Sequence, residues 1–171
     1  MVTEALSMHF ADHELVAMLR RSYSAVDGLW FMMCEEELSF DRAMALDERV
    51  WRVMPKLQAR KARELLGLTG NTPVELARAI GLKLTAEGHR FAATVHEGGV
   101  RLAIETCPWR AALERSGRLE IAAEVGRRIC TLEGEGWAAE FGEEFDFRMA
   151  ECLCDQGAQC CFEFTARRQL A

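Results

Sequence analysis

The apolar residues of this chain change their spacing close to residue 90, and this change limits the folds that the chain can adopt. Before residue 90, apolar side chains recur every three or four residues, the period of a helix with one apolar face. After it, apolar and polar side chains alternate in several stretches, the period of a strand with one buried face. The sequence therefore predicts an α+β fold, in which N-terminal helices precede a small antiparallel sheet covered by helices.

The helical half is divided by its capping and breaking residues. A first helix is predicted over about residues 12–37. A second begins at Ser39, a good N-cap, and ends near Gly67, with a kink or a break at Pro55. Pro73 suits the first turn of a third helix.

The second half carries the strand pattern, interrupted by helices. The predicted elements are a hairpin over 90–106, a helix over about 119–136, and two further strands over 145–150 and 161–165. We expect a helical N-terminal part, residues 1–70, and an α+β ligand-binding part, residues 71–171, which together form one compact unit.

Composition excludes some classes of function. Half of the 171 residues are hydrophobic, 28% are charged, and the formal net charge is -6. Nucleic-acid binding needs clustered positive charge, so we expect no nucleic-acid partner. No apolar run approaches the roughly 18 residues of a membrane helix, and residues 1–7 do not combine a basic segment with an apolar one. We therefore expect a cytoplasmic protein with no membrane partner.

Cysteines are crowded toward the end of the chain. Of the seven, five lie close together in sequence: Cys130, Cys152, Cys154, Cys160 and Cys161. An odd number of cysteines in a chain that is long enough to bury a core argues against a disulfide framework. Three interpretations of the thiols remain open: a metal site, small hydrophobic residues packed in the core, or redox or nucleophilic chemistry.

Strand phase makes Glu151 informative. If the apolar residues of strand 145–150 face the core, Glu151 continues the same series and points inward, where a carboxylate needs a partner. Cys154 follows in a turn, one of Cys160 and Cys161 opens the returning strand, and Cys130 ends the preceding helix. Three sulfurs and one oxygen suit tetrahedral zinc, with iron as the alternative metal.

Cys152 is expected to lie outside this site. Cys152 and Cys154 are separated by one residue, which is too close for both sulfurs to bind one tetrahedral metal comfortably.

These residues carry a resemblance. The stretch from Phe91 to Phe164, with Cys107-Pro108 after a strand and Glu151-x-x-Cys154-x-x-Gly157, resembles the 4-vinyl-reductase-type ligand-binding domain. That domain also serves as the phenol-sensing input domain of bacterial transcription activators. The resemblance implies a structural zinc held by Cys130, Glu151, Cys154 and either Cys160 or Cys161.

The N-terminal half carries a second resemblance. The segments 27–31 and 43–51, together with Cys107-Pro108-Trp109 and Cys161-Phe162-Glu163-Phe164, are similar to uncharacterised cytosolic proteins grouped near the 2-amino-thiazoline-4-carboxylate hydrolases. This resemblance implies a small-molecule hydrolase as an alternative function.

Aromatic and imidazole side chains are further candidates. Three tryptophans, Trp30, Trp51 and Trp109, either pack in the core or line an apolar ligand pocket between the helices and the sheet. The histidines are scattered in sequence, so we expect them at the surface or at helix ends: His9, His13, His89 and His96.

These observations favour a small-molecule-binding or sensor-like protein with a structural metal and an apolar pocket for a small apolar or aromatic molecule. The alternative is a hydrolase of the 2-amino-thiazoline-4-carboxylate hydrolase-like type that uses a cysteine or the metal site. A purely structural partner protein is a third hypothesis. A homodimer would form through an edge strand or the long first helix.

Overall fold

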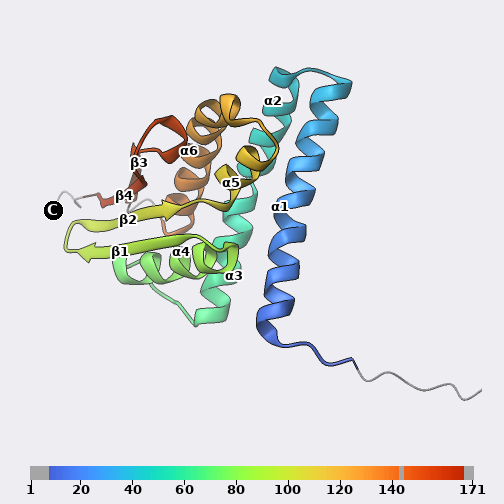
Figure 1. Ribbon diagram of the computed structural model, residues 1–171. Coiled ribbons are helices and arrows are strands. Elements are labelled where there is room, and N and C mark those ends of the chain that lie inside the picture. Colours follow the sequence, from blue (N-terminus) through green and yellow to red (C-terminus); the bar gives the residue numbers. More distant parts are fainter. Residues whose placement is uncertain (1–7, 143–144, 168–171) are drawn as a thin grey trace, which may run out of the picture.

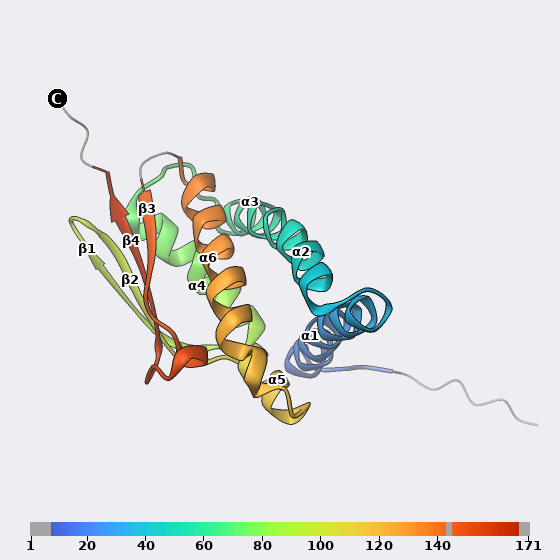
Figure 2. The same ribbon diagram turned by 90° about the horizontal axis from the view of Figure 1, so that it is seen from above.

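A four-stranded antiparallel sheet lies on one side of the protein, and helices are layered against one of its faces (Figures 1 and 2). The computed structural model describes residues 8–142 and 145–167. The arrangement is the predicted α+β fold, with helices first and the sheet after them. Residues 1–7, which entered the expectation of a cytoplasmic protein, lie outside the described residues. Within the described part, no helix is both long enough and apolar enough to cross a membrane.

The elements follow one another closely along the chain. In order they are α1 (Asp12–Glu37), α2 (Phe40–Trp51), α3 (Met54–Leu66), α4 (Pro73–Glu87), β1 (Arg90–His96), β2 (Gly99–Thr106), α5 (Pro108–Arg115), the short helical turn η1 (Leu119–Ile121), α6 (Ala122–Glu140), β3 (Phe145–Glu151), the turn η2 (Leu153–Asp155) and β4 (Cys160–Ala166).

Local sequence accounts for the helix boundaries. The Ser39 hydroxyl accepts a hydrogen bond from the backbone N–H of Arg42 at 3.3 Å, which is the predicted N-cap of α2. The helix predicted from Ser39 to Gly67 is broken into α2 and α3, and Pro55 lies in the first turn of α3. Gly67 ends α3 in the left-handed region, with φ 61°.

The last strand of the chain lies inside the sheet, not at its edge. The strand order is β1-β2-β4-β3, so β4 pairs with both β2 and β3. At one end of β2, a Cβ on Gly99 would lie 1.9 Å from the carbonyl oxygen of Phe164, so this close approach requires glycine. At the other end, Ile104 pairs with Cys160. This register places the cysteine-rich turn next to the helix layer.

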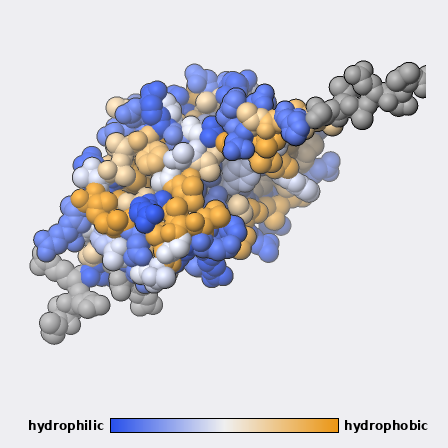
Figure 3. All heavy atoms as spheres, turned by 90° about the horizontal axis from the view of Figure 1, so that it is seen from below, coloured by the Kyte–Doolittle hydropathy of each residue, from blue (hydrophilic) through white to orange (hydrophobic). Residues whose placement is uncertain are grey.

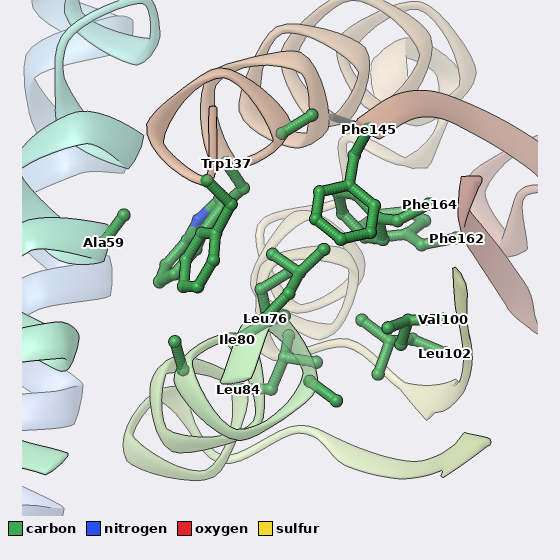
Figure 4. Close-up of a cluster of buried hydrophobic side chains, with 14 of the residues drawn as sticks. Ala59, Leu76, Ile80, Leu84, Val100, Leu102, Trp137, Phe145, Phe162 and Phe164 are labelled. Carbon is green, nitrogen blue, oxygen red and sulfur yellow. The ribbon is translucent and has the colours of Figure 1, made fainter. Parts of the chain in front are cut away.

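The core fills the space between the sheet and its first helix layer, α4 and α6 (Figures 2 and 4). Leu76, Ile80 and Leu84 of α4 lie between Trp137 of α6 and the inner face of the sheet, to which Val100, Leu102, Phe145, Phe162 and Phe164 contribute. Ala59 and Ala62 of α3 belong to the same cluster. The N-terminal and C-terminal parts therefore share one core.

Helix α1 differs from the other long helices, because none of its residues, all of which are described, is buried. Several of its apolar side chains, including Leu19, Leu29 and Trp30, are more than half exposed. Figure 3 shows hydrophobic side chains gathered in patches on the surface seen from below. Helix α1 is attached by polar and aromatic contacts. Arg20 donates to the carbonyls of Thr85 and Ala86 at 2.9 Å. Tyr23 packs on Trp109, and Phe31 packs on Phe40.

Candidate functional site

A partly enclosed cavity of about 90 Å³ lies between α4, α6 and the inner face of the sheet, with α1, α2 and α5 covering its outer side. It has three chemically distinct walls. One is ionic, one carries cysteine sulfurs, and one combines tryptophans with carboxyl groups. A cavity with convergent polar groups is the usual form of a small-molecule site.

The ionic wall is centred on Lys83 of α4. Its Nζ lies 2.9 Å from Glu87 Oε2, one helical turn further along α4, and also contacts Glu133 Oε1 of α6. The three side chains are about 90% buried or more. Burial alone would lower the pKa of Lys83, but the two carboxylates raise it above its usual value. Lys83 therefore stays protonated and acts as a counter-ion rather than a nucleophile.

His89 completes the ionic wall. Its side chain is only 6% exposed, and its Nδ1 lies 3.7 Å from Glu87 Oε2. Burial, followed by the charge of Lys83, lowers the pKa of His89 to about 3, so the ring is neutral. His89 lies just beyond the end of α4, in agreement with the helix-end prediction, but the turn after α4 directs its ring inward and not to the surface. Gln58 of α3 donates to Glu87 Oε1 at 3.2 Å.

Polar atoms on this wall lack regular hydrogen-bond partners. Among the described residues, buried Glu87 Oε2, Glu133 Oε1 and His89 Nδ1 make no hydrogen bond of regular geometry, although the two carboxylates contact Lys83 as ion pairs. Buried polar atoms in folded proteins are nearly always satisfied, so such a group calls for an explanation.

The sulfur wall consists of Cys107, Cys130, Cys154 and Cys160, with Cys152 behind it. Cys152 shares hydrogen bonds with both Cys154 and Cys160. These bonds lower the pKa of Cys152, and together with burial they raise the pKa of the other two thiols. The backbone N–H of Leu153 also donates to Cys160 Sγ at 3.3 Å.

Helix α6 approaches this cluster at Gly126. A Cβ added there would lie 3.0 Å from Cys154 Cβ and 3.3 Å from Cys152 Sγ. The glycine therefore lets the sulfurs of Cys152 and Cys154 approach the helix closely. Cys130, further along α6, is half-buried, and burial followed by the charge of Glu133 raises the pKa of its thiol.

The sequence-predicted ligands are only partly brought together. Cys130, Cys154 and Cys160 line the cavity. The Glu151 carboxylate instead accepts hydrogen bonds from the turn backbone, at 2.7 Å from Ala158 N and 3.4 Å from Gln159 N. Cys161 alternates to the opposite face of the sheet, beside Arg101 and Glu163.

Cys152, which was expected to lie outside the site, is the sulfur that contacts both Cys154 and Cys160. Across the described ranges, no group of three or more His, Cys, Asp or Glu side chains is arranged to hold a metal ion.

The third wall combines Trp51 and Trp109 with Asp27 and Asp47. The two indole rings pack edge to face, with centroids 5.9 Å apart. Burial raises the pKa of Asp27 to about 6, and burial together with the charge of Asp27 raises that of Asp47 to about 7. Trp30 does not reach this cavity: it is 69% exposed and lines an outer groove between α1 and α2.

Two grooves on the sides of α1 lead toward the cavity walls. A groove of about 400 Å³ between α1, α3 and α4 ends at Lys83 and Glu87. Another, of about 380 Å³, lies between α1 and α5 and ends at Asp27, Asp47 and Trp109. Lys83 and the third wall thus separate the enclosed space from open grooves.

Sequence reasoning missed the whole ionic wall. The signal was present in the helix period, because Lys83 and Glu87 continue the spacing of Leu76 and Ile80 along α4. Glu133 stands one turn before the buried Trp137 on α6. Charged residues in the phase of a core stripe are the pattern that would have identified this wall.

The fold and this cavity define a class: an α+β protein with a mixed ionic, thiol and aromatic internal site. The chain belongs to a family of unknown function, DUF6125, which matches residues 8–166. Neither a curated protein nor a solved structure matches the chain.

Proposed function

We propose that this protein binds a small molecule in the cavity beneath α1. The observation that carries the proposal is a partly enclosed space of about 90 Å³ in which two tryptophans face buried, incompletely satisfied polar atoms. A purely structural interior would be expected to be filled and to pair such atoms, since unpaired buried polar groups destabilise a fold. A ligand would supply the missing partners.

We propose further that the sulfur cluster holds a structural zinc, with iron as the alternative metal. Supporting this are the convergence of Cys152, Cys154 and Cys160 and the proximity of Cys130. Thiolates are preferred zinc ligands, and an N–H donated to a sulfur, as from Leu153, is a typical outer contact of such sites. The zinc would fix the turn before β4 against α6.

Ligand binding is tested by NMR titration of the full chain, following the indole N–H signals of Trp51 and Trp109. The probes are phenol, ethanol, ethylammonium and acetate, which differ in charge and aromatic character. We expect at least one probe to shift both signals. The variant Ala122→Leu, which fills space at the cavity wall, should abolish the shifts.

The matched control is Ala139→Leu at an exposed position of the same helix. It should leave the titration unchanged. If no probe shifts the indole signals of the wild-type protein, the binding role is refuted.

Zinc binding is tested by elemental analysis of protein purified without a histidine tag. We expect about one zinc per chain, reduced by Cys154→Ser and unaffected by Cys161→Ser, which lies on the other face of the sheet. Less than about half an equivalent of metal, with unchanged stability after chelation, would exclude this part of the proposal.

A hydrolase with a cysteine nucleophile is the second candidate. The observation in its favour is the lowered pKa of Cys152, because a thiolate is the reactive form. Cys107, at the cavity wall, instead has its pKa raised by burial. Rapid labelling of Cys152 alone by iodoacetamide at neutral pH would favour the enzyme, whereas uniformly slow labelling would exclude it.

A further inference from the structure

We propose that the cavity recognises a small organic cation with N–H donors, such as a primary ammonium group, held between Glu133 and the Asp27–Asp47 pair. The inference rests on the ligand-binding role proposed above and assigns the chemical class of the ligand. Its basis is an excess of buried acceptors and negative charge.

Carboxyl groups outnumber cations around the cavity. Asp27, Asp47 and Glu133 line it, and Glu87 lies behind Lys83. Against these four carboxyls the described residues supply Lys83 and Arg110 on the wall and Arg20 beyond it, whose charge acts on His89. Arg110 lies 3.8 Å from Glu114 outside the cavity. When all groups are ionised, four negative and three positive charges leave an excess of one negative charge.

This excess is not stable without a further positive charge or bound protons, because an uncompensated buried carboxylate is costly. Burial raises the pKa of Glu87, even though Lys83 opposes the shift. The pKa of Asp27 and that of Asp47 are raised as well, mainly by burial. Asp27, Asp47 and Glu87 therefore bind protons more readily than exposed carboxyls when the cavity holds no cation, and a cationic ligand would take the place of those protons.

The polar atoms of the ionic wall have the complementary chemistry. Glu133 Oε1, which already contacts Lys83 Nζ, is an acceptor with a second lone pair, and Nδ1 of the neutral His89 ring accepts when the proton is on Nε2. The His89 side chain is 94% buried, lines the cavity, and has no hydrogen-bond partner for Nδ1 among the described residues. An ammonium group offers three donors and no acceptor, so it matches these atoms where an anion would not.

The aromatic wall suits the same ligand. Trp51 and Trp109 line the cavity with their rings perpendicular, at an interplanar angle of 89°. Indole faces attract organic cations, and the attraction grows when the cation is desolvated.

The test compares three probes of similar size in the full-length protein at constant ionic strength: ethylammonium, ethanol and acetate. Ligands of three or four heavy atoms reach at best dissociation constants on the order of 1 mM, so titration by NMR is the suitable method. We expect ethylammonium to bind at least about tenfold more tightly than ethanol, the minimum expected of hydrogen bonds to charged groups, and acetate not to bind.

A matched pair of variants on α6 locates the effect. Glu133→Gln removes one charge and leaves Lys83 paired with Glu87, so it should remove most of the preference for ethylammonium over ethanol. Glu140→Gln, whose carboxylate pairs with Arg60 at the surface, should retain the preference. Circular dichroism checks that both variants are folded.

The outcomes separate the two proposals. If ethanol, phenol or acetate binds in the cavity as tightly as ethylammonium, the cation assignment is wrong while the ligand-binding role stands. If no probe binds, both fail. The comparison of probes in the wild-type protein decides the assignment even if Glu133→Gln does not fold.

Discussion

Helices α4 and α6 each pass through two interior regions with opposite chemistry. At one end, Leu76 and Ile80 of α4 meet Trp137 and Phe141 of α6 in a closely packed apolar region. At the other end, the same helices carry polar groups at or beside the cavity. These are Lys83 and Glu87 of α4, and Glu133 and Cys130 of α6.

The two regions contribute differently to stability. The apolar region stabilises the fold in proportion to the area that it removes from water. The polar region is costly to desolvate, and its groups are retained only if they are paired or if something else binds them. The comparison teaches that burial alone does not define a core: here half of the interior is suited to packing and half to recognition.

The largest expected change in stability is that of Trp137→Ala in the apolar region. The side chain is 2% exposed, and its loss leaves a cavity, so the free energy of unfolding should fall by about 4 kcal/mol. Urea denaturation measures it. Trp30→Ala, at an exposed position of α1, is the control and should change it by less than about 0.5 kcal/mol. Similar losses in both variants would contradict the assignment of the core.

In the polar region, Lys83→Met should lower the free energy of unfolding by roughly 3 kcal/mol at neutral pH, because it leaves two buried carboxylates without a counter-ion. Adding Glu87→Gln and Glu133→Gln to Lys83→Met should restore part of the loss. For comparison, Lys61→Met breaks only an exposed pair with Glu64 and should cost less than about 0.5 kcal/mol. No rescue by the triple change would show that the cost lies in packing rather than charge.

His89 makes the polar region acid-sensitive. In the unfolded chain His89 takes up a proton near pH 6.5, whereas its pKa in the folded protein is lowered to about 3. The free energy of unfolding therefore falls as the pH is lowered from about 6.5 toward 3, because the unfolded state binds the proton first. Between pH 7 and pH 5 the loss should be about 2 kcal/mol. Nearby charges that face His89 are Lys83, Arg20 and Glu87.

The measurement is urea denaturation at both pH values for the wild type, His89→Gln, and His13→Gln as an exposed control. Asp27 and Asp47 act in the opposite sense, since their raised pKa values favour the folded state at lower pH. The informative quantity is therefore the difference between wild type and variant. An equal acid response of the wild type and His89→Gln would contradict a buried neutral imidazole.

The smallest expected effect concerns the sulfur wall. Gly126→Ala introduces a Cβ in tight contact with Cys154 and should destabilise by about 1 kcal/mol, since improved helix propensity offsets part of the overpacking. Gly28→Ala on α1 meets no atom within 4 Å and should instead stabilise by about 0.5 kcal/mol. Thermal unfolding distinguishes the two. Changes of the same sign would show that α6 does not press against the cysteines.

The fold was largely predictable from the sequence, because caps, prolines and hydrophobic period are local signals. Ser39, Pro55 and Pro73 fall where helices begin or break, and the strands lie within a few residues of their predicted ranges. The one apolar helix pattern that misled is that of α1, whose apolar side chains are mostly exposed. Period identifies an apolar face, and only the tertiary arrangement decides what covers it.

The candidate site was less predictable, because it depends on contacts between distant segments. Strand phase predicted that Glu151 points inward, but the register shifts between Met149 and Glu151, and the following turn folds back so that its backbone N–H groups donate to the Glu151 carboxylate. The sequence left open whether Cys160 or Cys161 faces the site, and only the register of β4 places Cys160 there. The same turn places Cys152 beside Cys154 and Cys160. No local pattern reports that Lys83 of α4 and Glu133 of α6 meet.

The polar attachment of α1 bears on the kinetics of exchange. Arg20 links α1 to carbonyl groups in the last turn of α4, just before Gly88 and His89. None of the described residues of α1 is buried.

Lifting this helix breaks the ring contacts of Tyr23 with Trp109 and of Phe31 with Phe40, but it leaves the apolar core between α4, α6 and the sheet intact. The free energy of this local opening is therefore lower than that of global unfolding. For the ligand proposed above, such an opening would provide a route to the interior while the packed end of α4 and α6 stays closed.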